Sequence, residues 1–255
     1  NKTKDDLNIP DARLQRPRKI IIHDNLKKRL FYISCDYGIK KISKNSYEAS
    51  KNNLKNLIDE SNKKLILPKK VISQKNLVIK SNISKNTFKK NVAIAKKYIE
   101  VGDIFQVVLS QRFEANLLKE PIEIYKKIRK TNPSPFLYFI NYKDFQIVGS
   151  SPEILVRVKD SKITIRPIAG TRPRGKTKAE DAKLKKELLS DPKELAEHLM
   201  LLDLGRNDVG KFSEIGSVKV DSQFAVEKYS HVMHIVSNVT GKYKKNTSLI
   251  DVLLS

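Results

Sequence analysis

Three pairs of apolar runs, each pair joined by a short polar turn, constrain the fold of this chain most. The pairs are KIIIH and RLFYIS around Asp24-Asn25, FLYFINY and FQIVGS around Lys143-Asp144, and ILVRV and KITIR around Asp160-Ser161. All six runs are rich in the β-branched and aromatic residues that strands favour. Turns this short connect antiparallel neighbours, because parallel strands need a longer crossover. The sequence therefore predicts antiparallel hairpins.

Helical segments separate these hairpins. Residues 46–60 and 121–130 have helical patterns, and an apolar stripe from Phe88 to Ile99 ends at Gly102, a typical C-cap. A further strand is predicted over residues 104–113, where alternation places Gln106 among apolar neighbours as either a core amide or a catalytic one. We predict an α+β fold with antiparallel sheets and flanking helices, rather than a doubly wound parallel fold.

Length and composition indicate a globular protein. The 255 residues, 39% of them hydrophobic, suffice for one or two domains, and a Lys- and Ser-rich connector suggests a division into residues 1–82 and 83–255. We find no membrane-spanning run or secretory signal, which indicates a cytoplasmic protein. The lone Cys35 excludes an internal disulfide. Because the chain begins at Asn1 and ends within the apolar pattern TSLIDVLLS, we expect an internal piece of a longer protein.

The net charge of +23 raises the possibility of a basic nucleic-acid-binding module. Its lysines, however, are spread through nearly every segment, without the interleaved aromatic residues that would stack on bases. This distribution favours a solvated surface, and we expect no nucleic-acid partner and no membrane.

Two carboxylates stand out in the segment DPKELAEHLMLLDLGRNDV. Glu194 and Glu197 are three residues apart, so they share one face of a helix and could hold one divalent cation. Each also has a plain structural explanation. Glu194 fits a capping box with Asp191, and Glu197 could pair with Lys193 at the surface.

Two other segments could contribute to a site. PIAGTRPRG is expected to be a loop whose glycines, hydroxyl and cations suit an anionic ligand, although a structural loop would look similar. YSHVMHIVSNVTG reads as a strand, on which His231 and His234 point to opposite faces and cannot chelate one ion. One of these two histidines is available for proton transfer.

Six ordered segments together resemble the chorismate-utilising enzyme family, and within it the anthranilate synthase branch. They are DIFQVVLSQRFE, NPSPFLYF, GSSPEILVRV, ITIRPIAGTRPRG, ELAEHLMLLDLGRNDVG and VEKYSHVMHIVSNVTG. The resemblance covers most of residues 83–255 and implies that family's α+β fold, incomplete here. It makes residues 83–255 a chorismate-binding catalytic domain, and residues 1–82 the end of an amino-terminal region plus a connector.

The resemblance also implies roles for single residues. Glu197 would be a direct ligand of Mg²⁺, and Glu194 would act on the same ion through water. Glu153 matches the general acid for the departing 4-hydroxyl of chorismate, and His234 matches the histidine that lines the site. Gly170 and Thr171 match the floor of the substrate pocket, which Ala169 adjoins.

Gln106 and Ala169 discriminate between reactions within the family. A neutral amide at Gln106 cannot activate water as the lysine of isochorismate synthases does. Ala169 offers no amine where aminodeoxychorismate synthases of the folate pathway carry a nucleophilic lysine. The resemblance therefore implies addition of ammonia to chorismate and formation of anthranilate and pyruvate for tryptophan biosynthesis. Aminodeoxychorismate synthase remains the alternative within the family.

Partners follow from the same resemblance. A glutamine amidotransferase subunit, fused or separate, would supply the ammonia, and tryptophan would act as a feedback inhibitor. Pro135, Phe136 and Leu137 match part of the effector site, although the family's usual motif is closer to NPSPYM. Because the family continues beyond the residues that match here, we expect these 255 residues alone to be inactive.

Overall fold

The computed structural model describes residues 5–38, 43–65 and 77–254. Contacts divide the chain into two compact units, Asn1–Lys70 and Val71–Ser255. The domain boundary expected between residues 82 and 83 stays a prediction.

The first unit holds the first predicted hairpin and a helix. Strands β1 (Lys19–Asp24) and β2 (Arg29–Ser34) pair antiparallel. Residues 25–28 form the turn between them, and the Asp24 carboxylate accepts hydrogen bonds from the amides of Leu26 and Lys27 at 3.0 and 2.9 Å. Helix α1 (Lys44–Ser61), predicted over residues 46–60, begins at Ser43, which forms a reciprocal capping box with Ser46.

The second unit carries the remaining elements. Its helices are α2 (Lys85–Glu100), α3 (Pro121–Thr131), α4 (Lys178–Ser190), α5 (Pro192–Lys211) and α6 (Leu249–Leu253). Its strands are β3 (Ile79–Ser81), β4 (Phe113–Ala115), β5 (Phe136–Asn141), β6 (Gln146–Ser151), β7 (Arg157–Lys159), β8 (Lys162–Ile165), β9 (Ile168–Pro173), β10 (Lys219–Lys228) and β11 (Val232–Lys242). The predicted β5–β6 and β7–β8 hairpins are confirmed.

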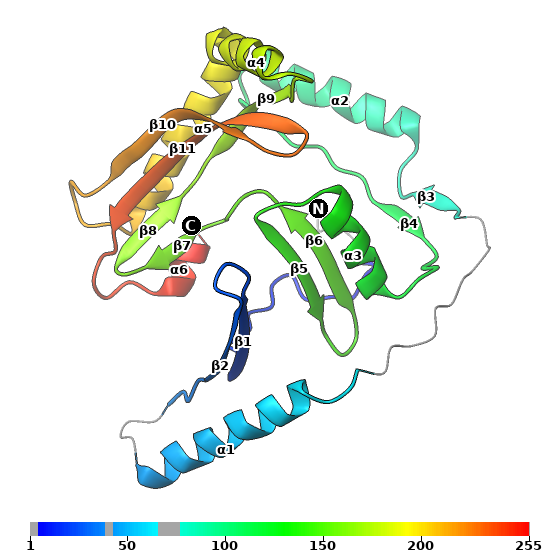
Figure 1. The fold of residues 1–255 in the computed structure, drawn as a ribbon. Helices are drawn as coiled ribbons and strands as arrows, with labels where there is room; N and C mark the ends of the chain where they lie inside the picture. The colour runs from blue at the N-terminus through cyan, green and yellow to red at the C-terminus, as the bar shows by residue number, and fades with distance from the viewer. Residues whose placement is uncertain (1–4, 39–42, 66–76, 255) are drawn as a thin grey trace. The chain divides into compact units, whose positions relative to one another are not determined.

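Strand β11 organises the main sheet. It pairs antiparallel with β10 along one edge and with β8 and β9 along the other, while β7 extends the sheet beyond β8. Helix α5 runs along one face of this sheet, and α4 lies near β9 (Figure 1). The predicted α+β class, with antiparallel sheets and flanking helices, is confirmed.

The core lies between this sheet and its helices. Met233 and Ile235 of β11 are fully buried against Leu188 of α4 and Leu195 of α5. Farther along the same strand, Val239 packs with Leu202 and Val209 of α5 in a second cluster. Since alternate residues of a strand share one face, odd-numbered positions of β11 face the helices and even-numbered positions, among them His234, face away.

The strand predicted over residues 104–113 is wrong over most of its length. Within the described chain only Phe113 belongs to a strand, β4, which pairs with β3, and residues 104–112 form neither helix nor strand. Phe105 and Val108 are 87% and 86% exposed, and Gln106 is exposed as well, so the alternation buries neither face. Alternation predicts which residues share a face, but a strand also needs a partner for its backbone hydrogen bonds.

The loop predicted for PIAGTRPRG is also wrong, because residues 168–173 form β9 and pair with β11. Gly170 has a positive φ of 75°, which glycine adopts without strain. The pairing shifts register between His234 and Ile235, as in a β-bulge. A composition typical of a loop is therefore compatible with a strand that bulges.

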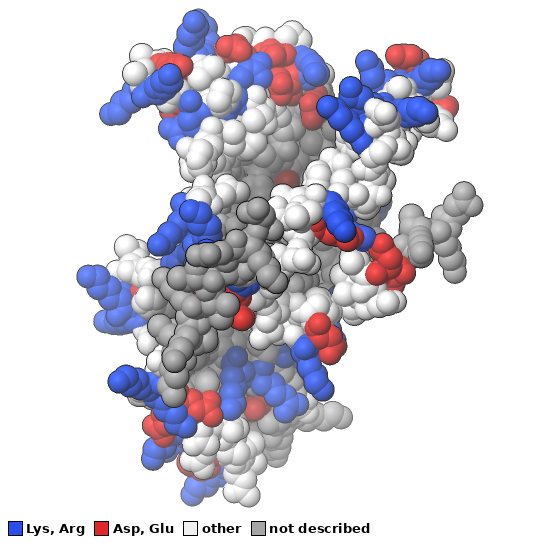
Figure 2. All heavy atoms as spheres, turned by 90° about the vertical axis from the view of Figure 1, so that its right-hand side faces the viewer, with Lys and Arg blue, Asp and Glu red and all other residues white. Residues whose placement is uncertain are grey.

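Charged side chains are scattered over the surface. Figure 2 shows Lys and Arg interspersed with Asp and Glu and with uncharged residues on the face it presents. No helix among the described residues is long and apolar enough to span a membrane.

Candidate active site

Thr171 and His234 are held together by strand pairing. They lie opposite each other in the β9–β11 ladder, and Thr171 Oγ1 is 3.0 Å from His234 Nδ1. The same ring nitrogen is 3.2 Å from the carbonyl oxygen of Gly170. A carbonyl only accepts hydrogen bonds, so this contact favours a proton on Nδ1 and leaves Nε2 as the acceptor.

Glu194 reaches this pair from helix α5. The N-cap of α5 is Asp191, whose carboxylate accepts hydrogen bonds from the amides of Lys193 and Glu194. The Glu194 side chain does not return to this cap, so the capping-box interpretation of Glu194 is wrong. Its carboxylate accepts from the Thr171 amide at 3.2 Å and from Arg172 Nη1 at 3.1 Å.

Glycine is required where Glu194 approaches β9. A Cβ atom added to Gly170 would lie 3.0 Å from Ile235 Cδ1 and 3.3 Å from Glu194 Oε2. The missing side chain, together with the positive φ, lets the helix carboxylate approach the Gly170–Thr171 backbone closely.

Arg172 is one of the cations that the sequence suggested for an anionic ligand, but it binds carboxylates of the protein instead. Its guanidinium donates to Glu187 at 2.9 Å and to Asp191 at 2.7 Å, in addition to Glu194, and its side chain is only 17% exposed. Hydrogen bonds to Glu187, Glu194 and Asp191 raise the pKa of Arg172, and the Arg172 guanidinium in turn lowers the pKa of Asp191. Arg172 thus ties β9 to both α4 and α5. The sequence could have indicated this role through the position of Arg172 directly after Thr171, because adjacent residues of a strand face opposite sides of the sheet.

Glu197 lies one helical turn beyond Glu194. Its Oε1 is 3.4 Å from Gln106 Nε2, a long hydrogen bond, and this contact takes the place of the surface pair with Lys193 that the sequence allowed. The exposed segment around Gln106 is thereby brought to the acidic face of α5. Gln106 is exposed, so the core-amide alternative for this residue is wrong.

The two glutamates fit a Mg²⁺ ion as a partial set of ligands. Carboxylate oxygens are the donors that this hard cation prefers, and it commonly takes one or two carboxylates while keeping several waters. Within the described residues, no cluster of three or more His, Cys, Asp or Glu could hold a metal ion. Both oxygens of Glu194 are already bonded to the protein, whereas Glu197 is engaged through one, so Glu197 is the better direct ligand.

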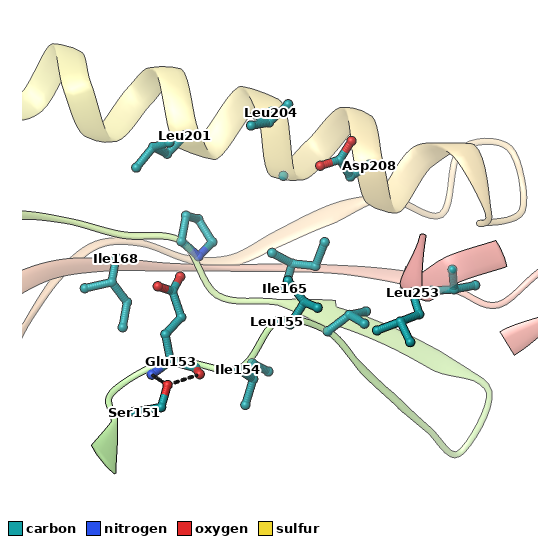
Figure 3. Close-up of a pocket in the computed structure, with 14 residues that line it drawn as sticks. Ser151, Glu153, Ile154, Leu155, Ile165, Ile168, Leu201, Leu204, Asp208 and Leu253 are labelled. Carbon is teal, nitrogen blue, oxygen red and sulfur yellow. Dashed lines mark hydrogen bonds between the residues drawn. The ribbon is translucent and has the colours of Figure 1, made fainter. Parts of the chain in front are cut away.

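Glu153 lines a cavity of about 500 Å³ between α5 and the segment that follows β6. Figure 3 shows its side chain reaching from this segment toward Ile168, with Leu201 and Leu204 of α5 across the cavity. Although the residue as a whole is exposed, its carboxyl group lies among apolar side chains, and this desolvation raises its pKa. The Ile168 backbone and the Arg166 cation oppose that rise.

The remaining predicted residues fall at distinct places. Ala169 is buried opposite Ile235 in the β9–β11 ladder. Pro135 precedes β5, and Phe136 and Leu137 pair with Ser151 and Ser150 of β6. His231 lies before β11 on the exposed surface, where its Nδ1 is 2.8 Å from Ser230 Oγ. The structure thus brings Gly170, Thr171, Glu194 and His234 together, joins Gln106 to Glu197, and places the 135–137 segment on another hairpin.

Comparisons with known proteins show the family of the chain. The family model described as chorismate binding enzyme matches residues 1–255. Anthranilate synthase component 1 of Acetivibrio thermocellus is 41% identical over 269 residues, covering 100% of this chain and 53% of that protein. The Synechocystis protein of the same name is 51% identical over 193 residues, covering 74% of this chain and 38% of its own length.

A solved structure extends the likeness to the fold. The crystal structure of anthranilate synthase component I from Streptococcus pneumoniae matches with a TM-score of 0.79 and 37% identity, over 92% of this chain and 51% of that one. The chain spans about half the length of the curated relatives it matches. With a family model matched along all its residues, the chain belongs to the chorismate binding enzyme family.

Proposed function

We propose that the protein carrying this chain is the large subunit of an anthranilate synthase. It converts chorismate and ammonia to anthranilate, pyruvate and water. The observation that carries the proposal is the joining of Glu194, Thr171 and His234, with Glu197 one turn away, in a chain similar along its length to anthranilate synthase component 1.

The nucleophile distinguishes this reaction from its relatives. Gln106 lies beside Glu197 and carries an amide, which cannot take a proton from water as a general base would. Ala169 is buried in β9 and presents no amine to the ring. Neither an activated water nor a protein amine is thus available at these positions, which favours ammonia as the nucleophile.

Each polar group has a task in the proposed reaction. Glu153 donates a proton to the 4-hydroxyl, which leaves as water while ammonia adds at C2, and desolvation raises the pKa of Glu153, which favours the protonated form that a general acid needs. The Nδ1 of His234 bonds to the Gly170 carbonyl, so Nε2 is the ring nitrogen that transfers a proton as pyruvate leaves and the ring becomes aromatic. Thr171 supplies a hydroxyl that fixes the imidazole.

Glu197 would hold a Mg²⁺ ion directly, and Glu194 would hold it through water. The chemistry such an ion supplies is charge neutralisation at the substrate's ring carboxylate and orientation of the ring. The Glu194 carboxylate also accepts hydrogen bonds from the Thr171 amide and from Arg172.

The source of ammonia and the inhibition of the reaction are also proposals that follow from the family resemblance. Ammonia would come from a glutamine amidotransferase partner, and free ammonium at high concentration would replace it. Tryptophan would inhibit at a site that includes residues 135–137 on the β5–β6 hairpin, which is separate from the Thr171–His234 pair. A cytoplasmic location remains an expectation.

Glu197→Gln in the full-length protein tests the proposal. The substitution keeps size and hydrogen bonding but removes the charge that a divalent cation needs, so we expect anthranilate formation from chorismate, ammonium and Mg²⁺ to fall by more than about 100-fold. The measurement is anthranilate fluorescence, with the product identified by mass.

Asp203→Asn is the matched control. Asp203 lies on the same helix, is 58% exposed and pairs only locally with Arg206. This variant should keep wild-type activity. Unchanged turnover in Glu197→Gln would remove Glu197 from the metal site, and a product mass other than that of anthranilate would reject the proposed reaction.

A further inference from the structure

The turn between β10 and β11 is held by Arg174, the residue that directly follows β9. The Arg174 amide donates a hydrogen bond to the His231 carbonyl at 3.0 Å, and its Nη1 donates to the Tyr229 carbonyl at 2.6 Å. The Tyr229 amide donates to the Val232 carbonyl across the turn at 2.8 Å. One arginine therefore binds the backbone at both ends of the turn.

Asp181 of α4 in turn holds Arg174. Its carboxylate accepts hydrogen bonds from Arg174 Nη2 and from the Gly175 amide, each at 2.7 Å, and from Arg174 Nε at 3.1 Å. Lys228, the last residue of β10, donates to the same carboxylate at 3.1 Å. The Asp181 side chain is only 7% exposed, so loss of these partners would leave a buried charge unpaired. The backbone of the turn is thus tied to a helix through a buried ion pair.

The first residue of this turn, Tyr229, packs against His234. The two ring centroids are 5.5 Å apart with an interplanar angle of 63°, close to the edge-to-face arrangement that aromatic rings favour. The Tyr229 hydroxyl donates to Glu227 Oε2 at 3.0 Å, and Glu227 lies opposite His234 in the β10–β11 ladder. The Tyr229 ring is therefore fixed both at its hydroxyl and through its backbone.

The orientation of the His234 ring depends on such packing. Its hydrogen bonds to Thr171 and Gly170 both involve Nδ1. The torsion that rotates an imidazole about its Cβ–Cγ bond is broad and roughly two-fold, and a half-turn would exchange Nδ1 with Cδ2. A ring packed against the imidazole restricts this rotation. Because proton transfer needs its donor and acceptor in line, a rotated imidazole would transfer the proton more slowly.

We propose that Tyr229, on a turn held by Arg174 and Asp181, is a positioning residue that keeps the His234 ring oriented for proton transfer. The inference rests on the proposed function, in which Nε2 of His234 transfers the proton. Tyr229 acts through His234 and touches no reacting atom in this assignment. Its loss should therefore slow the chemical step and leave chorismate binding unchanged.

The test is a double-mutant cycle in the full-length protein, with the rate scored as chorismate consumed at saturating ammonium. Tyr229→Leu should lower kcat roughly fivefold, the factor expected for an aromatic pair of this geometry, with an unchanged KM for chorismate. In a His234→Ala background the same substitution should change kcat by less than about twofold, because the ring on which Tyr229 acts is gone. A purely structural role would lower kcat equally in both backgrounds, and that result would overturn the proposal.

Tyr142→Leu is the matched control. Tyr142 begins the β5–β6 turn as Tyr229 begins the β10–β11 turn: its amide donates to the carbonyl three residues on, at 2.9 Å, and its ring packs against Phe145 with 4.8 Å between centroids. This variant should keep the wild-type kcat. Tyr229→Phe retains the ring and loses only the hydrogen bond to Glu227, so its kcat should stay within about twofold of the wild type. A loss in Tyr142→Leu as large as in Tyr229→Leu would contradict the proposal.

Arg174→Lys decides if Tyr229→Leu does not fold, as judged by circular dichroism and thermal melting. Lysine keeps a charge beside Asp181 but lacks the fork that also reaches the Tyr229 carbonyl, so kcat should fall about two- to fivefold, and only where His234 is present. An unchanged kcat would then reject the proposal.

Failure of the proposed function is recognised separately. A product other than anthranilate rejects the proposed reaction but leaves the cycle valid, because the rate counts chorismate and not product. Wild-type turnover in His234→Ala alone would remove His234 from the reaction, and this inference with it.

Discussion

The two faces of the β9–β11 ladder differ in what their side chains do. On the helix-facing side, Arg172 binds three carboxylates, and Met233 and Ile235 are fully buried against α4 and α5. On the opposite side, Thr171 and His234 bond to each other and remain accessible. Adjacent residues of one strand therefore face either the packed core or the candidate site, since the side-chain period of a strand is two.

The largest expected difference is between substitutions at Ile235 and at its neighbour His234. Ile235→Ala should lower the free energy of unfolding by about 2–5 kcal/mol, because it leaves a cavity in the packed core. His234→Ala should cost about 1 kcal/mol in stability but lower kcat roughly 100-fold or more. Urea denaturation and steady-state kinetics on both variants measure this difference. Equal losses of stability would break the comparison between the faces.

A smaller effect is expected at Gly170, where both faces meet. Gly170→Ala combines a strained positive φ with close contacts to Ile235 and Glu194, so it should cost about 2–3 kcal/mol in unfolding free energy. Gly216→Ala is the control, because Gly216 has φ 76° but nothing within 4 Å of an added Cβ. It should cost only about 1 kcal/mol. If urea denaturation gives the same loss of unfolding free energy for both variants, the contacts at Gly170 do not contribute to its cost.

The smallest effect concerns Asp221, which binds polar side chains on the His234 side of the sheet. Its carboxylate accepts from Lys162 and Thr240 at 2.9 and 3.1 Å, and chiefly the Lys162 bond lowers its pKa. A lowered folded-state pKa stabilises the fold above the unfolded-state value, about 3.9, and this contribution is lost as pH falls through the folded-state pKa.

Asp221→Asn should therefore cost less than about 1 kcal/mol at pH 7, because the side chain is 37% exposed and solvent screens the pair. The difference from the wild type should shrink on acidification toward pH 2.5, because the wild-type carboxyl takes up a proton as the pH falls through its lowered pKa. Urea unfolding at the two pH values tests this. A difference that grows on acidification would contradict the assignment.

Local chemistry made the hairpin turns predictable. Asp160 and Ser161 both adopt positive φ in the β7–β8 turn. Ser43, Ser84 and Thr177 each cap a helix with their own side chain, although the helix after Thr177, α4, is absent from the predicted elements. These features depend on residues within a few positions of one another, so they can be read from the sequence. The resemblance to a family supplied the order of the site segments.

Long-range pairing explains the errors. The PIAGTRPRG segment is a strand only because β11 lies beside it, and residues 104–112 alternate without a strand partner in the described chain. Likewise, the Glu194 side chain bonds to Arg172 and to the Thr171 amide, more than twenty residues away, instead of to the N-cap backbone of its own helix. Spacing along the chain contains no information about such neighbours.

The irregular step between His234 and Ile235 also matters while the protein is folding. If β11 paired one residue out of register, the imidazole would turn under the helices and the isoleucine would face water. Such an isomer would lose the apolar burial of Met233 and Ile235 and leave a polar ring without partners in the interior. The misregistered pairing would therefore be less stable than the native one, so the burial of these side chains specifies the register.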